Sequence, residues 1–214
     1  MESRLRDIRS TRNPKARIKI MEGHFATTHS HVNIYIDMST VKCRHNNARE
    51  TAKELASRYV NNKSIDTIIC MDGTEVIAAF MAEILADNSA LSINSGKNIS
   101  VISPEFGPNG QMIFRDNNQR MIKDMQVLLL VASATTGKTI SRAVECINYY
   151  GGQVCGISAI FSAAKESHGL EINTIFTSDD LPVKYEAYNM SDCPYCKQNH
   201  HVEAVVNGYG YSKL

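Results

Sequence analysis

The residues best suited to chemistry are five that surround one glycine, Thr135-Thr136-Gly137-Lys138-Thr139. They follow an apolar run at residues 127–131 and precede apolar residues at helical spacing. Unpaired N–H groups and the positive end of the dipole make a helix N-terminus attractive to phosphate. Gly137 permits close backbone approach, the threonines add hydroxyl donors, and Lys138 either adds a charge or points to solvent. The pattern predicts a phosphate-binding loop, with an ordinary threonine-rich turn as the alternative.

A second group with possible chemistry is Cys193-Pro194-Tyr195-Cys196. Two intervening residues are the spacing that places two cysteine thiolates on one metal ion. We take Cys193, Cys196 and His200 as candidate zinc ligands. Other ligands could come from a partner chain or from His201, Cys43 or His45. A reduced structural turn and a redox-active pair are the alternatives to a zinc site.

The elements that must position these residues alternate between strands and helices. Apolar runs predict strands near residues 66–71, 99–102, 127–131, 153–161 and 172–177. Helical spacing predicts helices near residues 46–60, 76–85 and 140–147. This alternation indicates an α/β fold with a parallel sheet and helices on both faces, in which ligands bind beyond the carboxyl ends of the strands. Upstream, residues 24–38 predict a half-buried strand in a hairpin, and residues 104–110 predict a loop.

Two known families have a loop of this kind. Taken as Ala132-x-x-x-x-Gly137-Lys138-Thr139, the segment resembles the P-loop of nucleotide triphosphatases, with alanine for the first glycine. Against this interpretation, the loop lies late in the chain, and no apolar strand ends in a magnesium-binding aspartate. Asp179 and Asp180 are poor candidates for that role. The P-loop is therefore the less favoured resemblance.

Taken from residue 127, the segment Val-Leu-Leu-Leu-Val-Ala-Ser-Ala-Thr-Thr-Gly-Lys-Thr resembles the signature of type I phosphoribosyltransferases. That signature is an apolar strand, two acids, two variable residues and then Thr-Thr-Gly-x-Thr. Residues 23–25 and 35–37 resemble the hood hairpin of the orotate phosphoribosyltransferases. Residues 66–85 are similar to the strand, pyrophosphate loop and helix that open the family's core, and residues 104–115 stand where the family has a flexible catalytic loop. The resemblance covers most of residues 20–165.

The resemblance implies a flavodoxin-like parallel core with a small N-terminal hood, and a homodimer that binds phosphoribosyl pyrophosphate with magnesium. The hood would comprise residues 1–45, the core residues 46–180, and a C-terminal segment residues 181–214. The implied 5-phosphate ligands are Ser133, Ala134, Thr135, Thr136, Gly137, Lys138 and Thr139. The implied pyrophosphate loop is Asp72, Gly73, Thr74 and Glu75. Base contacts would come from Phe25, His29 and Tyr35, and catalytic groups from Glu105 and Arg115.

The sequence departs from the family at three functional places. Val131 and Ala132 replace the acids that hold the ribose hydroxyls, and losing two charged hydrogen bonds costs about 3–6 kcal/mol. Residues 103–114 contain no Lys or Arg, and residues 27–30 replace a lysine, serine and glycine of the hood. Two hypotheses follow. Either the chain is a divergent enzyme in which Asp72, Glu75 or Glu105 holds the ribose, or it is a regulatory protein that binds a nucleotide or phosphoribosyl pyrophosphate without transfer.

Composition narrows the choice further. The 214 residues suffice for one domain with a small appendage, and 23 basic residues balance 22 acidic ones. The chain therefore has no overall field that favours nucleic acid or an anionic membrane, and we expect neither as a partner. No apolar run reaches the roughly 20 residues that span a bilayer, and the N-terminus is charged where a signal peptide is apolar. We expect a cytoplasmic protein.

Overall fold

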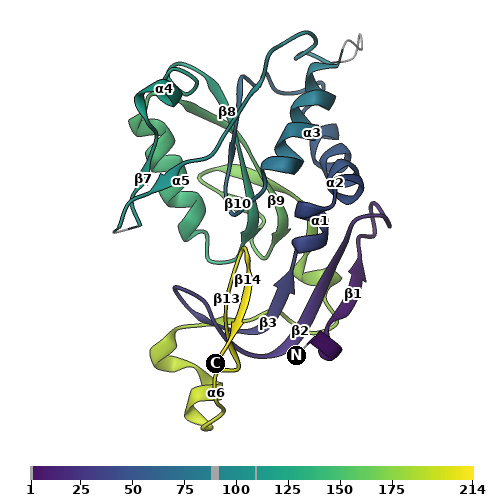
Figure 1. Cartoon of the computed structure of the whole chain (residues 1–214), viewed down its shortest axis with the longest axis vertical. Helices are drawn as coiled ribbons and strands as arrows, with labels where there is room; N and C mark the ends of the chain where they lie inside the picture. The colour runs from purple at the N-terminus through teal and green to yellow at the C-terminus, as the bar shows by residue number, and fades with distance from the viewer. Residues whose placement is uncertain (1, 88–91, 109) are drawn as a thin grey trace.

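A parallel sheet lies at the centre of the core in the computed structural model, which describes residues 2–87, 92–108 and 110–214 (Figure 1). Its strands are β4 (Thr67–Cys70), β5 (Ser100–Ile102), β8 (Gln126–Ala134), β9 (Gln153–Ser162), β10 (Glu166–Ser167) and β11 (Leu170–Thr177). They lie in the order β10-β11-β9-β8-β4-β5, and all pair in parallel except the edge strand β10. Counted along the chain, the parallel strands have the flavodoxin-like order 2-1-3-4-5. The predicted core is confirmed.

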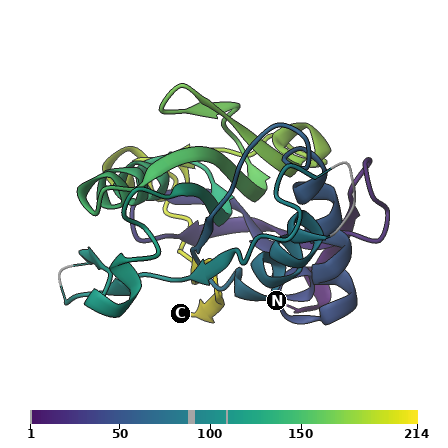
Figure 2. The same cartoon turned by 90° about the horizontal axis from the view of Figure 1, so that it is seen from above.

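Helices cover both faces of this sheet (Figures 1 and 2). They are α2 (His45–Ser57) and α3 (Glu75–Ala86) on one face and α5 (Lys138–Tyr149) on the other. The central strand β8 is apolar on both faces and therefore contributes to two cores. Leu128 and Leu130 pack with α2 and α3, whereas Leu129 and Val131 pack with α5. The layers predicted from the alternation of strands and helices are thus present.

The hood is a second sheet below the core, and it uses both ends of the chain (Figure 1). Its strands are β1 (Arg6–Arg9), β2 (Arg17–Ala26), β3 (His31–Asp37), β12 (Ala187–Tyr188), β13 (Ala204–Asn207) and β14 (Gly210–Lys213). They lie in the order β12-β3-β2-β13-β14, with β1 paired to β2. The residues after 181, which the sequence analysis set apart, therefore complete the sheet that the N-terminal hairpin begins.

Short elements connect the two sheets and flank the core. They are the helices α1 (Ser39–Cys43), α4 (Asp116–Gln119) and α6 (Pro194–Lys197), and the 3-10 turns Glu2–Arg4, Ser178–Asp180 and Met190–Asp192. The predicted loop at 104–110 instead includes a strand of a short antiparallel hairpin, β6 (Glu105–Phe106) with β7 (Met112–Ile113). Alternating glycines and prolines hid this hairpin from the sequence analysis. Asn109 in its turn lies outside the described residues.

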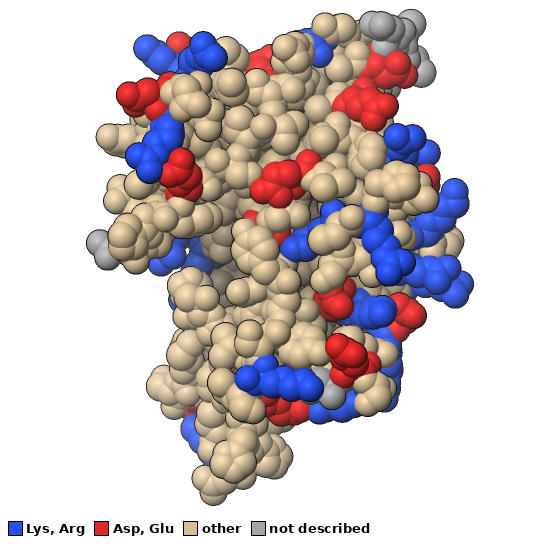
Figure 3. Space-filling model, in the orientation of Figure 1, with Lys and Arg blue, Asp and Glu red and all other residues tan. Residues whose placement is uncertain are grey.

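The surface of the molecule carries charges of both signs. On the face in Figure 3, basic and acidic side chains are interspersed, with Lys and Arg most numerous along the right-hand edge over α2 and β1. This distribution agrees with the formal net charge of +1. Within the described residues, no helix has the length and apolar character needed to cross a membrane.

Candidate functional site

A cavity of about 210 Å³ lies between the hood and the carboxyl end of the core sheet. The core contributes the end of β8 and the loop after it, and the hood contributes β3 and the turn at residues 27–30. The predicted site residues that line it are Asp72, Ser133, Ala134, Thr135, Thr136, Gly137, Thr139, His29 and Tyr35. The fold therefore brings together three segments that the sequence analysis had identified separately.

The phosphate loop forms the core side of this cavity. Strand β8 ends at Ala134, Gly137 is the N-cap, and α5 begins at Lys138. Gly137 has a φ of 74°, a left-handed conformation that favours glycine, and an added Cβ would meet no atom within 4 Å. The first N–H groups of α5 have no partner within the helix, so the loop can donate them to an anion.

Lys138 does not share the position of its neighbours. Its side chain is exposed and is not among the residues that line the cavity. Lys138 and Thr139 are successive residues of a helix and project about 100° apart, so only one of them can face the cavity. Lys138, which was predicted as a phosphate ligand, is directed to solvent, and the loop offers hydroxyl and backbone donors instead.

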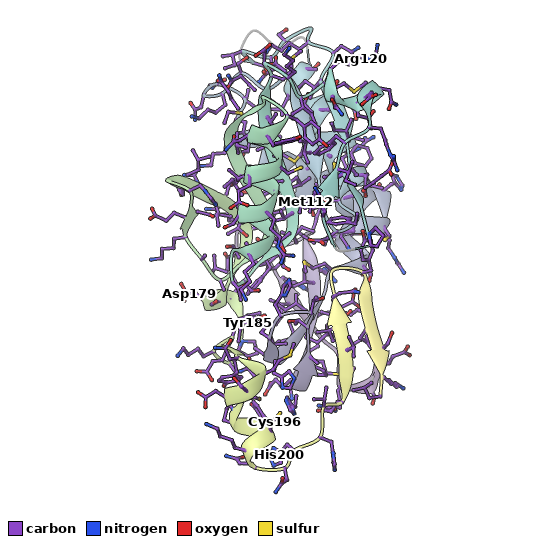
Figure 4. The ribbon with its side chains drawn as sticks, turned by 90° about the vertical axis from the view of Figure 1, so that its left-hand side faces the viewer. Met112, Arg120, Asp179, Tyr185, Cys196 and His200 are labelled. Atoms are coloured by element: carbon purple, nitrogen blue, oxygen red, sulfur yellow. The ribbon has the colours of Figure 1, made fainter. Side chains whose placement is uncertain are left out.

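Tyr185 is a cavity residue that the sequence analysis missed. It lies between hood and core (Figure 4) and forms a side-chain hydrogen bond with Thr135. Burial raises the pKa of Tyr185 to about 12, so its hydroxyl is protonated at neutral pH. No local pattern marks this tyrosine, because the following segment reaches the site only by joining the hood sheet as β12.

Asp72 supplies a carboxylate to the cavity. It follows β4, whose carboxyl end lies beside β8, and its φ of 57° is unusual for a residue other than glycine. Burial raises the pKa of Asp72, and the nearby Lys42 charge and the backbone N–H of Ala132 lower it in part. Of the three acids considered as ribose contacts, Asp72 lines the cavity, whereas Glu75 and Glu105 do not.

Comparison with known proteins places this geometry. No protein-family model matches the chain. It is 23% identical over 180 residues to the orotate phosphoribosyltransferase of Desulforamulus reducens, which covers 84% of this chain and 85% of the relative. The solved structure of Leishmania donovani UMP synthase matches with a TM-score of 0.56 at 18% identity, over 85% of this chain and 36% of the other. That of Mycobacterium tuberculosis orotate phosphoribosyltransferase with 5-phospho-alpha-D-ribosyl 1-diphosphate gives 0.51 at 16%, over 69% and 82%.

The chain has the type I phosphoribosyltransferase fold. Its sequence is similar to that of an orotate phosphoribosyltransferase, as the resemblance of the phosphate loop and hood had indicated. The similarity extends over most of that relative, but the chain spans only 36% of the UMP synthase that it matches. The fold is not that of the P-loop nucleotide triphosphatases, which were the less favoured resemblance.

Within the phosphoribosyltransferase fold, the positions of the two missing acids are buried. Val131 and Ala132 are both 0% exposed, because β8 continues for two residues beyond them. Val131 packs with α5 and Ala132 packs with the α2 and α3 side of the sheet. Neither residue lines the cavity, so the apolar pair belongs to the core of the sheet.

The remainder of the predicted pyrophosphate loop has other partners. The Thr74 hydroxyl is buried and donates to the Met71 backbone oxygen at 2.9 Å. Glu75 accepts a hydrogen bond of 2.7 Å from the Ser103 hydroxyl. An added Cβ on Gly73 would lie 3.3 Å from the Tyr209 ring. Gly73, Thr74 and Glu75 are therefore not brought to the cavity, although Asp72 is.

The turn between β13 and β14 covers this loop. Lys42 of α1 is buried, and its Nζ donates to the Asp72 backbone oxygen at 2.8 Å and to that of Gly208. The same Nζ lies 5.4 Å from the centroid of the Tyr209 ring, within the range of a cation–π contact. Figure 1 shows the β13–β14 hairpin reaching from the hood to the core. The chain thus places its own backbone and a lysine where the resemblance implies pyrophosphate.

The two predicted catalytic residues pair with each other outside the cavity. Arg115 donates from Nε and Nη2 to Glu105 Oε2, at 3.0 and 2.7 Å, and both side chains are exposed. The hairpin before Arg115 packs on α5, where the Met112 carbonyl accepts a weak hydrogen bond from Cys146 (Figure 4). Because the hairpin lies against α5, Arg115 and Glu105 are not among the lining residues.

The predicted base contacts are divided between the cavity and the hood core. His29 and Tyr35 line the cavity, but Phe25 is 0% exposed and does not. The Phe25 ring packs edge-on against Tyr35, with 6.2 Å between centroids. Successive residues of a strand face opposite sides, so Phe25 fills the hood core while its neighbour His24 points to the other face.

The cysteine pair has histidine neighbours other than the predicted one. The ligand atoms of His24, His31, Cys193 and Cys196 all lie within 4.8 Å of one another. His200, the predicted third zinc ligand, is not in this cluster and contributes its backbone oxygen to His24. The tight turn after α6 brings the His200 carbonyl, rather than its ring, toward the hood.

Proposed function

We propose that the protein is an orotate phosphoribosyltransferase-like protein of pyrimidine nucleotide metabolism, which binds phosphoribosyl pyrophosphate and transfers the phosphoribosyl group to a base. The observation that carries this proposal is the shared cavity of the phosphate loop, Asp72 and the hood. The loop amides and threonine hydroxyls would hold the 5-phosphate. The ring of Tyr35 and the turn at 27–30 would face the base. Sequence similarity to an orotate phosphoribosyltransferase supports the assignment.

Asp72 would take over the role of the missing acid pair. As a carboxylate it can accept hydrogen bonds from the ribose hydroxyls, and it would stabilise positive charge that develops on the ribose in the transition state. Burial raises the pKa of Asp72, so protonation removes this acceptor at a higher pH than for an exposed aspartate. We therefore expect affinity for ribose-bearing ligands to fall as the pH is lowered through that pKa.

The resemblance also implies magnesium, which would accompany phosphoribosyl pyrophosphate. The Asp72 carboxylate fits this ion, because Mg²⁺ prefers oxygen ligands and commonly combines one or two carboxylates with substrate phosphates. A bound Mg²⁺ would neutralise the charge of the leaving pyrophosphate. The chain itself would orient the ribose through Asp72 and the phosphate through residues 133–139.

Two measurements test the proposal. Calorimetric titration with phosphoribosyl pyrophosphate in the presence of magnesium, with uridine monophosphate and with inorganic phosphate should show binding. Pyrophosphate release should follow when orotate or another pyrimidine base is added. Thr136→Asp places a carboxylate in the loop and should weaken binding of all three ligands at least tenfold. Thr11→Asp, at an exposed threonine outside the cavity, is the charge-matched control and should bind as the wild type does.

Asp72→Asn separates the ribose contact from the phosphate contact. The substitution keeps the size of the side chain but removes its charge. Affinity for uridine monophosphate should fall, whereas affinity for inorganic phosphate should stay within about twofold of the wild-type value. Equal losses for both ligands would show that Asp72 does not contact the ribose.

Binding without transfer is the second candidate function, and the β13–β14 turn favours it. Lys42, Gly208 and Tyr209 cover the backbone that would contact pyrophosphate. Ligand binding with no pyrophosphate release from any base would support a regulatory protein and reject the transferase. Failure of all three ligands to bind would reject both functions. The homodimer and the cytoplasmic location stay predictions, and light scattering of the purified chain would test the first.

A further inference from the structure

Four side chains that bind soft metal ions converge at the end of the hood away from the core. His24 lies on β2, His31 begins β3, and Cys193 and Cys196 belong to the short helix α6 and its N-cap. Their ligand atoms lie within 4.8 Å of one another. Figure 4 shows Cys196 at this end of the molecule, well below Tyr185 of the cavity. The cluster is therefore separate from the phosphate site.

The separations within the cluster are those of ligands around one tetrahedral ion. Zn–S and Zn–N bonds of about 2.3 and 2.0–2.1 Å imply N···S separations of about 3.6 Å and an N···N separation of about 3.3 Å. His24 Nε2 lies 3.4 Å from Cys193 Sγ and 3.7 Å from Cys196 Sγ. His31 Nδ1 lies 3.3 Å from Cys196 Sγ and 2.9 Å from His24 Nε2. A bound ion requires only that the two nitrogens separate by about 0.4 Å.

The surroundings of His24 fix which nitrogen faces the cluster. Its Nδ1 lies 2.9 Å from the His200 backbone oxygen, which can only accept, so Nδ1 carries the proton. The Nε2 lone pair of the neutral ring then points at the two sulfurs. The ring is buried and stacks on Tyr195 with 5.2 Å between centroids. A carbonyl that orients the second nitrogen is the usual outer contact of a metal-bound histidine.

We propose that His24, His31, Cys193 and Cys196 bind one structural Zn²⁺. Two thiolates and two imidazoles in tetrahedral positions form a donor set that is typical of zinc. Four protein ligands fill the coordination shell and leave no position for a substrate, so the site holds structure and does not catalyse. The inference does not depend on which ligand the phosphate cavity takes.

The position of the site gives it a task in the fold. His24 and His31 lie on either side of the turn at residues 27–30, which lines the phosphate cavity. Within that turn the Thr27 hydroxyl accepts a 3.0 Å hydrogen bond from the Ser30 N–H. The zinc ion would join both strands of this hairpin to the C-terminal segment. It would thereby fix one wall of the cavity from outside.

Metal analysis of the full chain, purified without a His-tag in zinc-supplemented medium and dialysed, tests the proposal. We expect about one zinc per chain in the wild type, and less than about 0.2 in Cys196→Ser and His31→Ala. His200→Ala and Cys43→Ser are the matched controls and should keep the zinc, because neither side chain is in the cluster. Wild-type protein without zinc, or loss of zinc in His200→Ala but not in His31→Ala, would overturn the assignment.

Cobalt substitution gives a readout that does not require the variants to be stable. Co²⁺ added to wild-type protein freed of metal should produce the strong visible absorption of a tetrahedral site and a thiolate-to-cobalt charge-transfer band. Zn²⁺ should displace it with a stoichiometry of one. A disulfide between Cys193 and Cys196 is the competing state. Thiol titration of the unfolded, unreduced chain should find all 6 cysteines free, and only about four would reject the zinc site.

Discussion

Replacing Ala132 by aspartate restores one acid of the family signature, and we expect it to destabilise the protein rather than restore a ribose contact. Ala132 is 0% exposed and packs in the apolar cluster of α2, α3 and the sheet. A carboxylate there would lose its water without gaining a cationic partner. The new side chain would therefore be protonated in the folded protein, with a pKa above neutrality.

The size of the effect follows from the shift in pKa. An unfolded aspartate has a pKa of about 3.9, so holding it protonated at pH 7 costs about 1.36 kcal/mol for each of about three pH units, or about 4 kcal/mol. At pH 5 the same cost is about 1.5 kcal/mol. Because the folded-state pKa is the higher one, stability falls as the pH rises. The free energy of unfolding, relative to the wild type, should therefore decrease by about 2.5 kcal/mol between pH 5 and pH 7.

Urea unfolding of the variant and the wild type at both pH values is the assay. Ala132→Asn has a similar size but does not titrate, so its cost should be equal at pH 5 and pH 7. Ser133→Asp places the acid one residue further on, at a partly exposed position that lines the cavity, and should cost less than about 1 kcal/mol. An Ala132→Asp protein as stable as the wild type at pH 7, or one that binds phosphoribosyl pyrophosphate more tightly, would refute the reasoning.

Three further substitutions probe how the site is held. Gly137→Ala forces a Cβ into a φ of 74°, which should cost about 1 kcal/mol in thermal unfolding and weaken phosphate binding in calorimetry. Lys42→Met leaves two backbone carbonyls between core and hood without their donor and should cost about 2–4 kcal/mol in urea, whereas the exposed Lys53→Met should cost under about 0.5 kcal/mol. Tyr59→Phe removes a buried hydroxyl that bonds to β9 and should cost about 1–2 kcal/mol, whereas Tyr149→Phe, at an 83% exposed residue, should be neutral; equal effects for the two would contradict the role of the hydroxyl.

The sequence was sufficient for the core and for the phosphate loop. Alternating apolar strands and amphipathic helices predicted the parallel sheet, because the period of apolar residues directly reports which faces are buried. The strand, the Thr-Thr-Gly segment and the following helix lie within about twenty residues, so their arrangement is local. The same locality let the sequence identify Val131 and Ala132 as departures from the family. It gave no reason for them, whereas the structure shows both as part of the sheet's core.

Tertiary structure alone decided which distant residues complete the sites. Asp72 reaches the cavity because β4 pairs with β8, and Arg115 stays away because its hairpin packs on α5. His24 meets Cys193 across 169 residues of sequence, since the end of the chain returns to the hood that its beginning starts. Spacing in the sequence predicted the nearby His200 instead. Short-range patterns determine the strands, helices and turns of this protein, but the partners of a buried side chain depend on sheet pairing between segments far apart in the chain, which no local pattern encodes.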